Sequence, residues 1–114
     1  MRDIKFRAWD KVNKRWIKQF NIDLLNINIF SLPNIEINQY TGLKDKNEKE
    51  IYEGDILSSA FSKRIVIFDE NTCSFMLKDI RLRNELFLLT KEKSKNLEII
   101  SNIYENGNLI GDEE

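Results

Sequence analysis

Short stretches in which apolar and polar residues alternate constrain the fold of this chain more than any other feature. From Ile4 to Trp9 the alternation has a period of two, which places successive side chains on opposite faces of a β-strand. Residues 10–14 have turn chemistry, and residues 15–20 supply a second apolar run. The beginning of the chain is therefore predicted to form a β-hairpin.

Isoleucine or leucine alternates with asparagine over residues 21–38, and Pro33 interrupts this pattern. Proline has no backbone N–H donor, so a sheet edge or a break is expected there. A β-prone segment with little charge promotes aggregation when its edge is exposed. We expect the core to cover this segment, and coverage by another subunit is the alternative.

The middle of the sequence predicts a turn followed by a bent strand. Residues 41–50 are polar and have turn chemistry. Residues 51–57 are expected to form a short strand, in which Gly54 marks a β-bulge or a close approach of two backbones.

A second hairpin is predicted next. The nearly continuous apolar run at residues 64–68 is typical of a buried strand. Residues 69–71 turn the chain into a return strand that carries Phe75 and Leu77 on one face.

The pattern between residues 79 and 90 fits two structures. Leu82, Leu86 and Leu89 have helical spacing, whereas residues 86–89 are equally suited to a buried strand. Periodicity does not decide between helix and strand here.

The remaining segments complete a mostly β fold. Residues 91–96 are charged and predicted to be a loop, and residues 97–104 are predicted to be the last strand. Several short strands with little helix indicate a barrel or a sandwich. Their order favours a small SH3-type barrel with an additional N-terminal β-hairpin. Since no linker or repeat interrupts the chain, we expect one domain over residues 1–114.

Three segments make the chain similar to a known family. They are residues 4–10 (IKFRAWD), residues 39–47 (QYTGLKDKN) running into residues 49–56 (KEIYEGDI), and residues 103–106 (IYEN). The sequence resembles the YopX-like proteins of bacteriophages and prophages over nearly its whole length. This resemblance implies a phage or prophage origin and an SH3-type barrel, and it implies no catalytic residues. Glu48 stands where the family usually has glycine, which puts an Asn-Gly turn there in doubt.

Composition argues against common enzyme classes and against secretion. The net charge is -1, so no global field attracts nucleic acid or anionic lipid. The chain has no histidine, which removes the usual general base and zinc ligand. Cys73 is the single cysteine and is expected to be a half-buried structural thiol. With no secretory signal evident, we expect a soluble cytoplasmic protein of the host cell that uses no cofactor.

Two carboxylates define the one candidate for metal chemistry. Glu53 and Asp55 are two residues apart on a predicted strand, so both would point to one face and could hold Mg²⁺. The neighbouring acidic residues alternate with lysines, which indicates a solvated loop. We therefore predict neither a metal site nor an enzyme.

Aromatic and charged residues of the family-like segments form the candidate interaction surface. Trp9 lies on the Lys5 and Arg7 side of its strand, where it is either exposed or buried by another element. Core filling is the default role of the other rings, since small β domains need large side chains. The candidate residues are Lys5, Arg7, Trp9, Lys18, Tyr40, Tyr52, Glu53 and Asp55.

These observations lead to three functional hypotheses. The first is a non-enzymatic module that binds a host or phage protein and also self-associates. The alternative is a nucleic-acid-binding protein that uses the basic N-terminal hairpin. The third is a Mg²⁺-dependent hydrolase at Glu53 and Asp55.

Overall fold

The computed structural model of the chain contains two antiparallel β-sheets. It describes residues 4–17, 34–59, 62–80 and 85–105. The first sheet has the order β2-β1-β3-β4 and consists of β1 (Phe6–Asp10), β2 (Arg15–Trp16), β3 (Ile35–Lys44) and β4 (Glu50–Tyr52). The second sheet has the order β8-β7-β6-β5-β9 and consists of β5 (Asp55–Ser58), β6 (Lys63–Asp69), β7 (Ser74–Asp79), β8 (Leu86–Leu88) and β9 (Glu98–Asn102).

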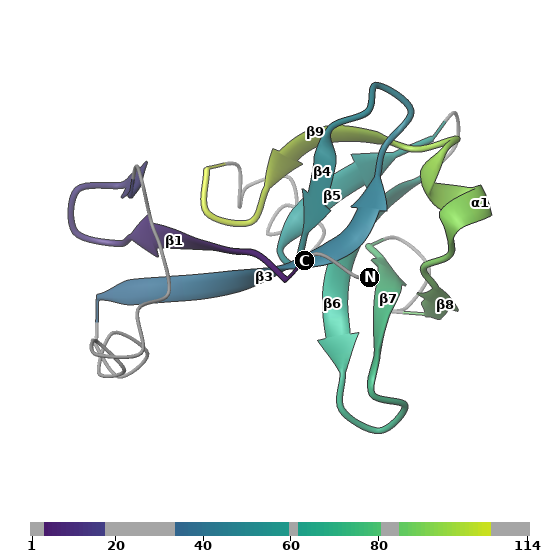
Figure 1. Cartoon of the computed structure of the whole chain (residues 1–114), viewed down its shortest axis with the longest axis horizontal. Helices are drawn as coiled ribbons and strands as arrows, with labels where there is room; N and C mark the ends of the chain where they lie inside the picture. Colours follow the sequence, from purple (N-terminus) through teal and green to yellow (C-terminus); the bar gives the residue numbers. More distant parts are fainter. Residues whose placement is uncertain (1–3, 18–33, 60–61, 81–84, 106–114) are drawn as a thin grey trace.

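The prediction of a mostly β fold is confirmed for these residues. The second sheet curls into a half-barrel, and the first sheet projects from it as an arm made of β1, β2 and the beginning of β3 (Figure 1). Among the described residues no helix has the length and apolar character needed to cross a membrane.

The predicted N-terminal hairpin is confirmed. Strand β1 pairs with β2 through Trp9 and Trp16, and the carboxylate of Asp10 accepts hydrogen bonds from the backbone N–H groups of Val12 and Asn13. Aspartate is common at such turn positions because its carboxylate can accept hydrogen bonds from the backbone of the same turn. The other edge of β1 pairs with the first half of β3, so the hairpin grows into a sheet.

Strand β3 is longer than the sequence pattern predicted. Residues 41–44 were expected in a turn but belong to the strand, which pairs with β4 through Tyr40 and Tyr52. The hydroxyl of Thr41 donates to the carbonyl of Ile51, so a polar residue here ties two strands together. The turn itself follows Lys44, and Glu48 adopts a φ of 63° there without glycine.

The segment predicted as one bent strand is two strands of different sheets. Strand β4 ends at Tyr52 and β5 begins at Asp55, so Gly54 lies in the turn between the sheets. Its φ of 92° is favourable only for glycine. Its N–H donates to the carbonyl of Val66, and its carbonyl accepts from the N–H of Ile103. Through these two hydrogen bonds Gly54 connects the turn to β6 and to the residue that follows β9.

The second predicted hairpin is confirmed as β6 and β7, which pair from Arg64 and Asp79 to Asp69 and Ser74. Only the beginning of the apolar run is buried, however, and Phe68 is exposed. The end of this hairpin extends beyond the body of the sheet, so no second layer of the described residues covers it (Figure 1).

Two further predictions were wrong, and the choice between helix and strand is settled for residues 86–88. Residues 86–88 form strand β8, whereas residues 81–84 lie outside the described residues. Residues 91–94 form the short helix α1 (Lys91–Ser94) in place of a loop, because Thr90 accepts the N–H of Lys93 as an N-cap. Cys73 is exposed in the β6–β7 turn with a φ of 52° and is not half-buried.

The core lies on the inner face of the curled sheet. Alternate residues of β5, β6 and β7 supply its centre, namely Leu57, Val66 and Leu77. Ile51 of β4, with Leu89 and Leu97 on either side of α1, completes the buried cluster.

Strand β9 begins directly after Leu97 and confirms the predicted last strand. Most of the segment at residues 21–38, including Pro33, lies outside the described residues, so the expectation that the core covers it is not tested.

We expect Gly54→Ala to lower the free energy of unfolding by about 1–2 kcal/mol, since a Cβ is strained at positive φ. Space is not the reason, because an added Cβ would meet Asn38 and Ile103 at ordinary contact distances of 3.5 and 3.6 Å. Urea denaturation measures the effect. Glu70→Ala in an exposed turn is the control and should change stability by less than about 0.5 kcal/mol. Equal stability of Gly54→Ala and the wild type would contradict this account of the turn.

Candidate functional site at the junction of the two sheets

The side chain of Arg7 connects the two sheets. Its guanidinium lies 2.8 Å from the carboxylate of Asp55, and it also donates to the carbonyl of Glu53 and the side-chain oxygen of Asn38. The guanidinium lies over the rings of Trp16 and Tyr52, at 4.2 and 4.8 Å from their centres. We call these six residues the Arg7 junction.

The alternation of β1 explains why these side chains meet. Arg7 and Trp9 point to one face of the strand, and their partners across the sheet are Asn38 and Trp16. This face of the first sheet turns toward the β4–β5 turn, which brings Asp55 to Arg7.

Trp9 is buried by other elements, which settles the alternative left open by the sequence. Only 5% of its surface is exposed. Its ring stacks on Tyr104 at 5.5 Å and meets Trp16 edge-on at 4.9 Å. The indole N–H of Trp16 donates to Glu105 at 2.7 Å, so the arm also contacts the residues that follow β9.

Burial and charge oppose each other at Asp55. Burial raises the pKa of this carboxyl, because a charged group loses hydration, while Arg7 and the N–H of Tyr52 act in the opposite direction. The direction of the shift is upward. Asp55 is only 2% exposed, so its ionised form depends on the charge of Arg7 for stabilisation.

A second polar cluster lies beside the Arg7 junction. Lys5 forms an ion pair with Glu50, which lowers the pKa of that carboxyl, and Glu50 also accepts from the hydroxyl of Tyr52. The ammonium of Lys5 lies 5.5 Å from the ring centre of Tyr40, which packs against Tyr52. Lys5 and Glu50 remain partly exposed, whereas Tyr40 is buried.

The two carboxylates considered for Mg²⁺ lie on either side of a turn and have different surroundings. Gly54 puts a turn between Glu53 and Asp55, and Asp55 is engaged by Arg7 and Tyr52. Within residues 4–17, 34–59, 62–80 and 85–105, no group of three acidic or cysteine side chains could hold a metal ion.

Seven of the eight candidate interaction residues therefore lie at or beside one junction. Lys18 lies outside the described residues. Trp9, Tyr40 and Asp55 are buried, so they act here in packing, and the role of the group in binding a partner stays a prediction.

The sequence pattern did not single out Asn38, Trp16 or Glu105 as site residues. Asn38 is buried, and its amide donates to the hydroxyl of Tyr104 while its oxygen accepts from Arg7. Trp16 could have been found, because the hairpin register places it opposite Trp9. No local pattern marks Asn38 or Glu105 as site residues, because the bonds of Asn38 to Arg7 and Tyr104 and the bond of Glu105 to Trp16 join distant parts of the sequence.

Asp45 is a second buried carboxylate, and it closes the turn after β3. It accepts from the N–H groups of Asn47, Lys49 and Ile99, so it also ties this turn to β9. Burial raises its pKa, but the three backbone donors outweigh burial and the pKa is lowered overall.

We expect Arg7→Met to lower the free energy of unfolding by about 3–5 kcal/mol, because it leaves Asp55 buried without a partner. Adding Asp55→Asn should recover part of this loss, and a double-mutant cycle measures the coupling. The control is Lys11→Met in the exposed pair with Glu36, where a loss below about 1 kcal/mol is expected. Equal losses for Arg7→Met and Lys11→Met would contradict a structural role for the junction.

We expect Asp45→Asn to remove a pH-dependent part of the stability. A carboxyl with a lowered pKa in the folded state stabilises the fold above its unfolded pKa of about 3.9, and this contribution is lost as the pH falls through the folded value. The difference in unfolding free energy between wild type and Asp45→Asn should be constant above about pH 5 and shrink toward pH 3. Urea denaturation at several pH values checks this, with Glu70→Gln as control. A difference that does not depend on pH would contradict it.

Comparisons place this arrangement among known proteins. A sequence model of the family described as YopX protein matches residues 19–111. The crystal structure of protein EF1440 from Enterococcus faecalis is similar with a TM-score of 0.69 at 22% sequence identity, and the match covers 96% of this chain and 99% of that chain. At this level of identity the likeness establishes a shared fold. A search of curated proteins found no match.

Proposed function

This chain belongs to the YopX protein family, and from that premise we propose that it is a non-enzymatic, phage- or prophage-encoded accessory protein that binds another protein. Host and phage proteins are both candidate partners. The observation that carries the proposal is a row of apolar side chains on the outer face of the curled sheet.

This row runs across three neighbouring strands and is called the outer patch. Ile67 of β6 lies opposite Met76 of β7, which in turn lies opposite Leu88 of β8, and Leu86 is two residues away on the same face. Leu86 and Leu88 are 43% and 49% exposed. Alternation puts their neighbour Phe87 on the opposite, inner face, so the leucines do not contribute to the core.

An apolar patch of this kind is suited to a protein partner. When a second protein covers water-exposed leucines that adjoin a methionine, apolar surface is removed from water and the free energy falls. Methionine and aromatic side chains are enriched in the centres of interfaces, because they adapt their shape to the partner. Strand β8 ends the order of its sheet in the described part of the chain, so a partner can approach from the side.

The proposal extends to the SH3-type barrel. The curled sheet supports it, because β5, β6, β7 and β8 follow one another as neighbours and β9 returns beside β5 after the single turn of α1. An experimental structure that leaves β4 and β9 far from closing the barrel would argue against it.

The site of action that we propose is the cytoplasm of the host cell. The exposed thiol of Cys73 supports it, since exposed free thiols persist in reducing compartments.

Protein binding is preferred over nucleic-acid binding by the N-terminal hairpin. Lys5, Arg7 and Lys11 each form an ion pair with a carboxylate, which leaves less free positive charge for phosphate groups. Binding to single-stranded DNA with a steep dependence on salt would reverse this preference.

We expect the double variant Leu86→Ser and Leu88→Ser to lose the partner. Tagged protein from infected host cells should recover the same protein with the wild type and at least about tenfold less of it with the variant, because the buried apolar contact is worth more than about 1.4 kcal/mol.

The control is Ile100→Ser, which removes an isoleucine that is 40% exposed on β9. Light scattering on the purified wild type tests self-association through the same patch. The role of the outer patch would be contradicted if the wild type and the double variant recovered equal amounts of the partner and light scattering gave the molar mass of a monomer.

A further inference from the structure

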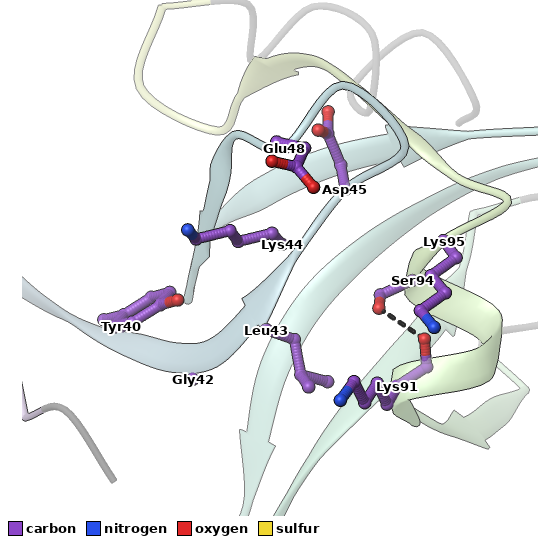
Figure 2. A pocket seen from close by; sticks show the side chains of 9 residues that line it. All are labelled: Tyr40, Gly42, Leu43, Lys44, Asp45, Glu48, Lys91, Ser94 and Lys95. Carbon is purple, nitrogen blue, oxygen red and sulfur yellow. Dashed lines mark hydrogen bonds between the residues drawn. The ribbon is translucent and has the colours of Figure 1, made fainter.

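A pocket of about 230 Å³ lies between the end of β3, the turn that follows it and helix α1. Figure 2 shows Leu43 at its centre, with Lys91 extending from α1 toward it and Lys44 on the side of β3. The outer patch does not contribute to this pocket, so the two surfaces are independent.

Three lysines line the pocket, and two of them have no carboxylate partner in the part of the chain that the structure describes. Lys91 and Lys95 form no ion pair or side-chain hydrogen bond there. Lys44 lies opposite Glu50 of β4, its charge lowers the pKa of that carboxyl, and its side chain extends away from α1 (Figure 2). Lys46, in the turn after β3, differs because it pairs with Glu98 at 3.5 Å. Lys91 and Lys95 are also four residues apart at a helical turn, where like charges repel each other. An anion between them would relieve this repulsion.

The acidic groups of the pocket do not cancel this charge. The carboxylate of Asp45 is buried and accepts hydrogen bonds from three backbone N–H groups, so these bonds within the protein occupy it. Glu48 is exposed on the turn and is the one carboxylate of the pocket lining that is free to meet solvent. The balance of unpaired groups in the lining is positive.

The floor of the pocket is suited to a short apolar stem. Leu43 and Tyr40 supply carbon surface, and Gly42 adds no side chain. The hydroxyl of Ser94 donates to the carbonyl of Lys91 and offers no hydrogen to a ligand (Figure 2). A glutamate side chain fits this combination, because its methylene groups can lie on Leu43 while its carboxylate reaches the lysines.

We propose that this pocket binds an acidic side chain of an extended peptide segment in a protein partner. Its volume is below the about 300 Å³ at which pockets for small ligands begin, so it accommodates one side chain rather than a cofactor. Glu48 opposes a polyanion such as nucleic acid, whose binding requires a longer series of unopposed cations.

Fluorescence anisotropy tests the proposal with the full-length protein. The probe is a fluorescein-labelled decapeptide with two glutamates between leucines, and the matched peptide carries glutamines in their place. We expect the glutamate peptide to bind at least about fivefold more tightly, with an affinity that falls as salt is added.

The triple variant of Lys44→Gln, Lys91→Gln and Lys95→Gln should bind the glutamate peptide about tenfold more weakly. The control variant of Lys11→Gln, Lys14→Gln and Lys63→Gln makes the same change in net charge away from the pocket and should bind like the wild type. Circular dichroism verifies that both variants are folded.

Two outcomes overturn the proposal. One is equal binding of the two peptides or equal weakening by both triple variants, and the other is tighter binding of a thymidine decanucleotide than of the glutamate peptide. The Leu86 and Leu88 variant should still bind the glutamate peptide. Failure here is thus distinguishable from failure of the outer patch, which is measured by partner recovery.

Discussion

The ion pair between Arg7 and Asp55 is the interaction on which the arrangement of the two sheets depends. A carboxylate that is 2% exposed requires a cation, and the nearest one comes from the first strand of the other sheet. The planar guanidinium meets Asp55, Asn38 and two aromatic rings at once, which a lysine could not do. The junction therefore fixes both the position and the direction of the arm relative to the half-barrel.

This constraint explains what the conspicuous polar and aromatic residues of the sequence do in the fold. The carboxylate of Asp55 and the ring of Trp9 are engaged in packing and pairing between sheets. The surfaces that we propose for recognition lie elsewhere, on the outer patch and in the pocket beside α1. The outer patch exposes apolar area to solvent, and the pocket carries an excess of positive charge.

Local pattern was a good guide to strands and a poor guide to their ends and partners. The hairpins β1–β2 and β6–β7 were predicted correctly, because alternation and turn residues act over a few neighbouring positions. Residues 41–44 were misread as a turn, because they pair with β4 and the hydroxyl of Thr41 donates to Ile51, and a pattern along the chain does not contain that information. Likewise Thr90 caps a helix in a segment whose charge had indicated a loop. Of the candidate site, the sequence supplied most residues and omitted Asn38, Trp16 and Glu105.

The sequence by itself determined the mostly β character, the N-terminal hairpin, the hairpin of β6 and β7 and the last strand, because each follows from side-chain alternation and local turn chemistry. Tertiary structure decided that Gly54 separates two sheets, that Trp9 is buried and that Arg7 pairs with Asp55. These outcomes join residues that are up to 95 positions apart, as with Trp9 and Tyr104. Such contacts depend on how the sheets pack and on the dielectric environment that packing creates, and neither is encoded in the spacing of neighbouring residues.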